Sequence, residues 1–191
     1  MGTRKNWTPN PACKNDTVGW SGNSTFSRTT TITGLPRTTG INWTGNGYSQ
    51  TPRGVCVPDD IFTVSFYIKN KTGIPVAGRT VYVSFTRTSG GDVFPETFTV
   101  TPGADGNVVR GSFTTSPAPA NADGIYLIID SLNGLGSGFD ISSVMYEKVG
   151  SLDTYFDGDS LNSVWDGVDG NSTSTYTDPP SVSVGAFLPL L

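Results

Sequence analysis

The chain has 191 residues, of which 15% are charged, and its formal net charge is -4. This length suits one domain with a hydrophobic core, plus at most a short appendage. The acidic balance argues against a nucleic-acid partner, and no apolar stretch approaches the roughly 20 residues needed to cross a membrane.

The composition favours strands and turns over helices. The chain contains 24 Gly and 13 Pro, and it is rich in Ser and Thr while Ala and Leu are scarce. Long helices need Ala, Leu, Glu and Lys, whereas Thr, Val, Tyr and Phe separated by Gly, Pro, Asn and Asp are typical of strands and turns. We therefore expect an all-β fold.

Alternation of apolar and polar side chains predicts strands along most of the chain. The Thr-rich first strand is expected to be an outer one, and the nearly continuous apolar run at 125–130 to be buried on both faces. Turn signals separate these segments, which is typical of a jelly-roll β-sandwich. In chain order, the segments are Phe26–Thr33, Phe62–Lys69, Val81–Thr86, Phe98–Val100, Val109–Thr114, Ile125–Asp130 and Phe139–Glu147.

The composition changes after Val149. The following residues are rich in Asp and carry too few apolar side chains to form a core alone. We expect residues 1–150 to form the jelly-roll sandwich, and residues 151–191 to form a hairpin-like appendage with an apolar tail.

The tail ends in large apolar side chains with no charge between them. Such a segment favours association, because burying each large apolar side chain is worth roughly 1.5–3 kcal/mol. We predict that Phe187, Leu188, Leu190 and Leu191 dock on a partner subunit, either another copy or a neighbouring protein. The alternative is that the tail closes the sandwich as a final edge strand.

Two cysteines, Cys13 and Cys56, allow one disulfide or two separate thiols. Residues 1–7 carry basic side chains but not the apolar core of a secretory signal. We therefore expect folding in a reducing cytosol and two separate buried thiols, with a bridge as the alternative.

Three parts of the sequence resemble galactose-binding-like jelly rolls, which include many carbohydrate-binding modules. The first is an Asn-Pro turn and a Gly-Trp pair, at residues 6–13 and 17–20. The second is the turn and strand at 58–69, and the third is the domain exit at 145–159. Its Tyr-Phe-Asp-Gly-Asp motif, with the Ser- and Thr-rich strand at 172–176, is similar to minor tail and other virion proteins of tailed phages of actinobacteria.

This resemblance implies a jelly roll, and it does not bring a calcium site with it. Members that bind calcium tend to carry an acidic residue after the Asn-Pro turn and an acidic pair in the last core strand. The matching positions here are Lys14 and Ser142-Ser143. An ammonium at that place opposes a hard cation, which needs several oxygen ligands with carboxylates among them.

Candidate glycan contacts are Trp43 and Tyr48, because we expect them in a loop at 42–50 that is rich in Gly and Asn. Exposed aromatic rings can pack on the C–H faces of a pyranose, and ordinary packing or protein contact is the alternative for both. The Asp157-Gly158-Asp159 segment is interpreted as a turn with solvated carboxylates, with an ion site as the alternative.

Catalysis is not expected. The chain contains no histidine, which removes His-dependent triads and the usual zinc sites. Carboxylate pairs such as Asp92 and Glu96, or Asp157 and Asp159, fit glycosidase chemistry in principle, but nothing in the sequence places them in a cleft. We expect no cofactor and no metal.

The leading hypothesis is a virion structural protein of a tailed phage, most simply a minor tail protein, made in the host cytoplasm and exposed on the released particle. Its expected partners are other tail or capsid proteins and further copies of itself, with no nucleic acid and no membrane. A capsid-decorating or fibre protein is an alternative. A carbohydrate-binding module that recognises a host-surface polysaccharide is another.

Overall fold

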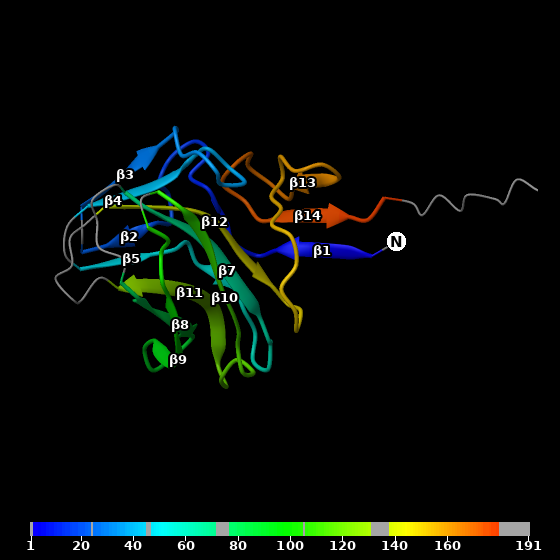
Figure 1. The fold of residues 1–191 in the computed structure, drawn as a ribbon. Coiled ribbons are helices and arrows are strands. Elements are labelled where there is room, and N and C mark those ends of the chain that lie inside the picture. The colour runs from blue at the N-terminus through cyan, green and yellow to red at the C-terminus, as the bar shows by residue number, and fades with distance from the viewer. Residues whose placement is uncertain are drawn as a thin grey trace, which may run out of the picture.

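The computed structural model describes residues 2–23, 25–44, 47–71, 77–104, 106–130 and 138–179. These residues form strands, turns and loops without any helix, which confirms the all-β prediction. Two antiparallel sheets pack face to face as a jelly-roll β-sandwich, and a small third sheet lies beside one end of it (Figure 1).

The first sheet has five strands in the order β10-β7-β12-β4-β3. Four of them overlap segments in which alternation predicts a strand, and β3, expected to be an outer strand, lies at an edge. Their bounds are β3 Thr25–Thr29, β4 Gly40–Thr44, β7 Thr63–Asn70, β10 Val108–Thr114 and β12 Phe139–Glu147.

The second sheet follows the order β2-β5-β11-β8-β9, with β6 paired to β11 as a sixth strand. Its long strands β8, β9 and β11 contain the segments expected at 81–86, 98–100 and 125–130. The bounds are β2 Ser21–Gly22, β5 Tyr48–Gln50, β6 Gly54–Val55, β8 Arg79–Arg87, β9 Val93–Val100 and β11 Ala122–Asp130.

The small sheet has the order β1-β14-β13. Its strands are β1 Thr3–Asn6, β13 Ser163–Trp165 and β14 Ser174–Thr177. β13 and β14 form an antiparallel hairpin, and β1 from the beginning of the chain pairs with β14. The division of the chain at residue 150 stays a prediction, and the structure adds that β1 belongs to the same sheet as the hairpin.

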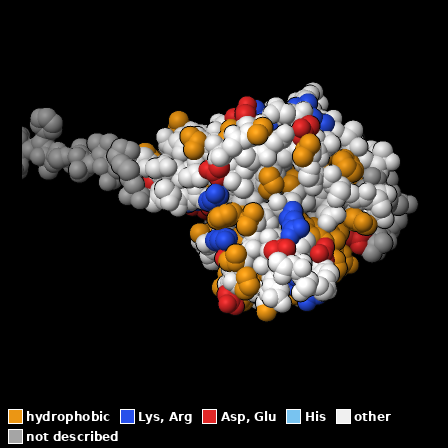
Figure 2. Space-filling model, turned by 180° about the vertical axis from the view of Figure 1, so that it is seen from behind, with side chains coloured by type: hydrophobic (Ala, Val, Ile, Leu, Met, Phe, Trp, Pro, Cys, Tyr) orange, Lys and Arg blue, Asp and Glu red, His pale blue; other side chains and the backbone are white. Residues whose placement is uncertain are grey.

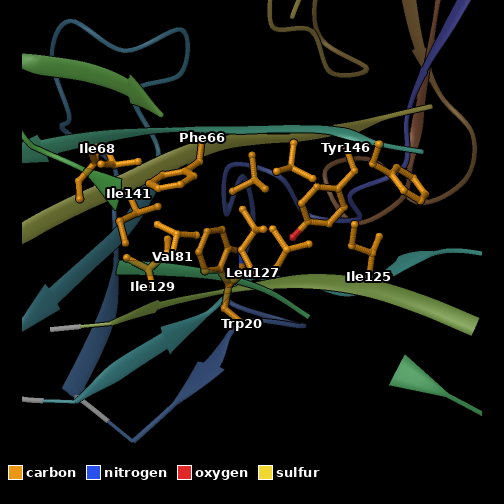
Figure 3. Close-up of a cluster of buried hydrophobic side chains, with 14 of the residues drawn as sticks. Trp20, Phe66, Ile68, Val81, Ile125, Leu127, Ile129, Ile141 and Tyr146 are labelled. Carbon is orange, nitrogen blue, oxygen red and sulfur yellow. The ribbon is translucent and has the colours of Figure 1, made fainter. Parts of the chain in front are cut away.

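The hydrophobic core fills the space between the two large sheets (Figure 3). Successive side chains of a strand point to opposite faces, so every second residue of β7, β8 and β11 enters the core. These fully or almost fully buried residues are Val64, Phe66, Ile68, Val81, Val83, Phe85, Ile125, Leu127 and Ile129.

The segment at 42–50 is not a continuous loop. β4 extends to Thr44, and Tyr48 begins β5. Ile41 and Trp43 alternate toward the core, and Trp43 is paired with Phe139 of β12. The loop prediction was wrong here because such short strands are specified by their neighbours in the sheet, which local composition does not reveal.

Asn6 connects β1 to the sandwich. Its side chain is fully buried, and its Nδ2 donates to the carbonyl oxygens of Val144 and Phe156, both at 3.2 Å. Its Oδ1 accepts the backbone N–H groups of Thr8 at 3.0 Å and Tyr146 at 3.2 Å. The amide therefore uses both of its donors and satisfies two buried backbone donors, as a buried polar side chain must.

Cys13 and Cys56 are both buried, and both are free thiols, in agreement with the prediction of two separate thiols. Burial raises the pKa of the Cys56 thiol to about 12 and raises the pKa of Cys13 as well. A thiol that stays protonated at neutral pH is a poor nucleophile, so these residues act as small core side chains.

Candidate functional site

The outer face of the second sheet carries side chains that do not enter the core. On β11, Leu127 and Ile129 point inward, so Tyr126, Ile128 and Asp130 point to the other side of the sheet. Side chains of the nearly continuous apolar run in this strand therefore lie alternately in the core and on a partly open surface.

A pocket of about 280 Å³ opens on this outer face. Three aromatic side chains, one aliphatic side chain and one carboxylate contribute to its lining. The lining residues are Asn23, Gly47, Tyr48, Tyr82, Phe94, Ile128 and Asp130. A mostly apolar concave site with a few polar groups has the character of a small-ligand site.

The order of the strands explains why these residues meet. Tyr48 of β5 lies opposite Asp130 of β11, and Tyr82 of β8 lies opposite Ile128 of β11. Residues directly opposite each other share one face of a sheet. Phe94, which is 50% exposed, comes from β9 on the far side of β8.

Asn23 and Gly47 shape the rim beside Tyr48. The Asn23 Oδ1 accepts the backbone N–H of Tyr48 at 2.8 Å. Gly47 has a φ of 126°, and a Cβ added to it would collide with the Asn23 side chain. A larger residue at position 47 would therefore disturb the hydrogen bond that holds the start of β5.

Tyr126 lies one outward position before Ile128 on β11, and its hydroxyl donates to Asp92 Oδ2 at 2.7 Å. The pKa of Tyr126 is raised to about 12, mainly by burial and to a smaller extent by the hydrogen bond with Asp92. The phenol therefore stays neutral near pH 7 and holds the Asp92 carboxylate close to the chain segment that carries Phe94.

The two residues predicted to contact a ligand have different environments. Tyr48 is half-buried and lines the pocket. Trp43 is 1% exposed, and its ring packs against Phe139 with the centroids 5.8 Å apart. A ring in the core cannot stack on a sugar, so for Trp43 the packing alternative is the correct one.

Sequence reasoning missed Tyr82, Phe94 and Asp130. The alternation at 81–86 already placed Tyr82 on the face opposite Val81 and Val83, and that signal could have marked it. Nothing local connects Tyr82 with Phe94 or Asp130, because their proximity depends on the order of strands in the sheet.

The predicted assembly contacts Phe187, Leu188, Leu190 and Leu191 lie outside the described residues. Docking of this segment therefore stays a prediction.

The carboxylates of the Asp157-Gly158-Asp159 turn are paired with cations of the protein. Asp157 is buried and receives a hydrogen bond from Arg37 Nε at 2.6 Å, while Tyr155 donates to it at 2.9 Å. The carboxylate thus fastens the turn to the loop that carries Arg37.

Lys14 occupies a position between two further carboxylates. Its Nζ lies 2.8 Å from Asp159 Oδ1 and 2.6 Å from Asp169 Oδ1. Burial alone would lower the pKa of Lys14, but the hydrogen bonds with these two carboxylates outweigh it and raise the pKa. Position 14, where the resemblance would place an acidic calcium ligand, thus holds an ammonium group that is paired with two carboxylates of the same chain.

The Asp92 and Glu96 carboxylates accept hydrogen bonds from different parts of the chain. Glu96 accepts the backbone N–H of Ser116 with both oxygens, at 2.9 and 3.1 Å, whereas Asp92 accepts from Tyr126. In the described part of the chain, no group of three or more Cys, Asp or Glu side chains is arranged to hold a metal ion. Within the same residues, no helix could span a membrane.

No family model and no curated protein matches the sequence. Solved structures are similar in fold. The CBM22-1 xylan-binding domain of Paenibacillus barcinonensis Xyn10C has a TM-score of 0.55 at 13% identity, covering 76% of this chain and 94% of that domain. TmCBM61, solved with beta-1,4-galactotriose, has a TM-score of 0.52 at 10% identity, covering 74% and 97%.

A third similar structure is the enzymatically active domain of tailspike protein 4 from bacteriophage CBA120. Its TM-score is 0.54 at 15% identity, and the match covers 74% of this chain but 21% of the tailspike chain. The present chain therefore corresponds to about a fifth of that structure. At these identities the comparisons show a shared fold, the jelly-roll β-sandwich that carbohydrate-binding modules also use.

Proposed function

We propose that this protein binds carbohydrate in the pocket on the outer face of its second sheet. The observation that carries the proposal is the convergence of Tyr48, Tyr82 and Phe94, from three different strands, around Ile128. Aromatic rings present flat apolar surfaces on which the C–H faces of a pyranose can pack. Polar groups of Asn23 and Asp130 at the same pocket supply acceptors for sugar hydroxyls.

The fold supports this proposal. Modules described as binding xylan, or solved with a galactose trisaccharide, have the same sandwich architecture. Because one fold serves many activities, the aromatic lining of the pocket carries the proposal.

The proposal is binding without hydrolysis. Glycosidases of the common type place two carboxylates on either side of the scissile bond. Among the described residues that line the pocket, Asp130 alone carries a carboxylate. A single carboxylate can orient a sugar by accepting hydrogen bonds, and it does not complete that catalytic pair.

A glycan array followed by calorimetric titration tests the proposal. We expect the unmodified protein to bind at least one glycan, and Phe94→Ala and Tyr82→Ala each to weaken that binding about tenfold or more, since stacking and buried area are lost together. Leu161→Ala is the matched control, because Leu161 is 85% exposed on the appendage and does not line the pocket. Absence of any array signal, or equal affinity of the three variants, would contradict the proposal.

We further infer that the protein is a component of a tailed-phage virion, in the first place a minor tail protein. The order of the motifs, over roughly residues 6–178, supports this inference, as does the shared fold with a phage tailspike domain. Capsid decoration and a fibre protein are the alternatives. A glycan-binding domain on the released particle would contact host-surface polysaccharide, while other virion proteins and further copies of the chain would hold it in place.

Immunogold labelling of purified particles tests the virion location. Labelling at the tail supports a minor tail protein, and labelling over the capsid supports decoration. Particles that contain no trace of the chain, by labelling and by mass spectrometry, would contradict this second proposal and leave the glycan proposal intact.

A further inference from the structure

The strand β13 forms an open edge of the small sheet, because among the described residues it pairs with β14 alone (Figure 1). The backbone N–H of Asp166 donates toward β14, to the carbonyl oxygen of Thr173 at 2.9 Å. In an antiparallel strand, every second residue bonds to the same neighbour, so Val164 also directs its backbone groups to β14. The carbonyl groups of Ser163 and Trp165 and the N–H of Trp165 therefore point to the open edge.

Apolar side chains are concentrated along this edge. Among the described residues, three of the four most exposed large apolar side chains lie here: Leu161 at 85%, Val164 at 62% and Val168 at 69%. Natural proteins commonly protect an open edge with Lys or Pro, and the segment at 161–168 contains neither. The edge is therefore suited to pairing with a further strand.

The chemistry of this edge favours an apolar strand over a charged one. On the face of the molecule seen in Figure 2, acidic and basic side chains are interspersed among hydrophobic ones, and neither sign dominates a broad area. That face thus offers no broad charged area that would steer a charged partner.

The sequence that follows β14 has the matching composition. Residues 181–191 carry no charged side chain, and they begin with alternating Ser and Val, which is typical of a strand. Val184 and Phe187 are three residues apart, as are Leu161 and Val164. An antiparallel strand that places Val184 opposite Val164 therefore places Phe187 beside Leu161.

The apolar tail at 181–191 cannot form this antiparallel pairing with the β13 of its own molecule. A strand antiparallel to β13 is parallel to β14, because β13 and β14 are antiparallel. Parallel strands need a connection of about a dozen residues or more, whereas only Asp178, Pro179 and Pro180 separate β14 from Ser181. The tail of a second copy is not limited in this way.

We propose that the open edge of β13 receives residues 181–188 of a second copy as an added antiparallel strand. Main-chain hydrogen bonds to Ser163 and Trp165 hold the added strand, and its apolar side chains contact Val164 and Leu161. Reciprocal exchange of two tails gives a closed dimer. This inference goes beyond the proposed function and does not depend on glycan binding.

Disulfide trapping in the full chain tests the pairing. One variant carries Val164→Cys, and a second variant, with an affinity tag, carries Val184→Cys. The Cα atoms of such an opposed pair lie about 4.5 Å apart, which is within the range of a disulfide. Oxidation of the mixture should therefore give a covalent heterodimer on a non-reducing gel, while the buried thiols of Cys13 and Cys56 do not compete.

Val18→Cys is the matched control, because Val18 is 64% exposed and lies outside β13. Its mixture with Val184→Cys should give no heterodimer. A chain that carries both Val164→Cys and Val184→Cys identifies the occupant of the edge. A disulfide between copies gives a covalent dimer, whereas a disulfide within one chain leaves a covalent monomer.

A substitution at the edge tests its contribution to association. Val164→Lys places an ammonium group among the apolar contacts and should raise the dissociation constant of the dimer about tenfold or more. Val18→Lys should leave that constant unchanged. Sedimentation equilibrium measures both values, and circular dichroism confirms that each variant is folded.

The outcomes separate this inference from carbohydrate binding. A covalent monomer from the chain with both cysteines would overturn the assignment to a second copy. Equal trapping with Val18→Cys and Val164→Cys, or unchanged association of Val164→Lys, would overturn β13 as the receiving edge. An unmodified protein that is monomeric at all concentrations would overturn the exchange of tails, and the glycan array would still decide the proposed function.

Discussion

Phe66 and Phe94 show how the position of an aromatic side chain decides what it contributes. Phe66 is completely buried between the sheets, and its ring lies 6.4 Å from that of Phe98. Phe94 leaves half of its surface in solvent at the mouth of the pocket. The first residue stabilises the fold, while the second is available to a ligand.

Replacing Phe66 with Ala should lower the free energy of unfolding by about 3–5 kcal/mol, because a large buried side chain is lost and a cavity remains. Phe94→Ala should cost less than about 1 kcal/mol, since its side chain is already half in water. Chemical denaturation of the two variants measures both values. A loss below about 1 kcal/mol for Phe66→Ala would mean that the inward face of β7 is assigned wrongly.

At the scale of elements, the sequence predicted the long strands well. The alternation at 62–69 and 81–86 follows from burial on one face, and β7 and β8 lie there. β4 and β5 were missed because their pairing, with β12 and β11, is a tertiary property. For the same reason, the sequence identified only part of the pocket. It indicated Tyr48, but it could not indicate the residues of other strands that line the pocket with it.

Several ion pairs connect the appendage to the rest of the molecule. Lys14 holds Asp159 and Asp169, and Lys5 forms an ion pair with Asp166 at 3.1 Å. Burial would raise the pKa of Asp159, but the hydrogen bonds from Lys14 and Trp165 lower it below its ordinary value. The pKa of Asp166 is likewise lowered, because hydrogen bonds from Thr173, Thr175 and Lys5 outweigh burial.

The lowered pKa values of these carboxylates predict that acid weakens the attachment of the appendage to the sandwich. A carboxylate whose pKa is lowered by folding stabilises the folded state above its unfolded pKa of about 4, and this stabilisation is lost as the pH falls through the lower, folded value. Lys14→Met should therefore reduce stability by less than about 1 kcal/mol near pH 7, since these pairs are partly exposed, and should reduce the pH dependence below about pH 4.

Limited proteolysis across this pH range measures the attachment, with cleavage in residues 151–179 as the signal. Lys71→Met is the matched control, because the Lys71 side chain makes no ion pair in the described structure. Identical pH profiles for Lys14→Met and the unmodified protein would show that the ammonium does not fasten the appendage.

At the scale of the whole molecule, residues that the structure describes form the hydrophobic core between the two sheets. We therefore expect the stability of the sandwich not to depend on the apolar tail. Deleting residues 186–191 should leave the melting temperature nearly unchanged. The same deletion should abolish association between copies or incorporation into particles, because it removes the large apolar side chains Phe187, Leu188, Leu190 and Leu191.

Light scattering coupled to size-exclusion chromatography measures the association state of the deleted protein, and a thermal melt measures its stability. An unfolded truncated protein would mean that the tail belongs to the core. A folded truncated protein with unchanged association would mean that copies contact one another through a different surface.

The pairing of β1 with β14 has a mechanical consequence. Thr3 lies opposite Thr177 and Asn6 lies opposite Ser174, so the start of β1 and the end of β14 lie at the same end of one antiparallel pair. Tension applied between the ends would open this pair like a zipper, breaking its hydrogen bonds one after another instead of all together. In Figure 1 the N-terminus and the end of β14 lie on the opposite side from the end of β11, which carries the pocket residue Asp130. Under load, the small sheet would therefore yield at low force and lengthen the chain, while the sandwich and its pocket remain folded.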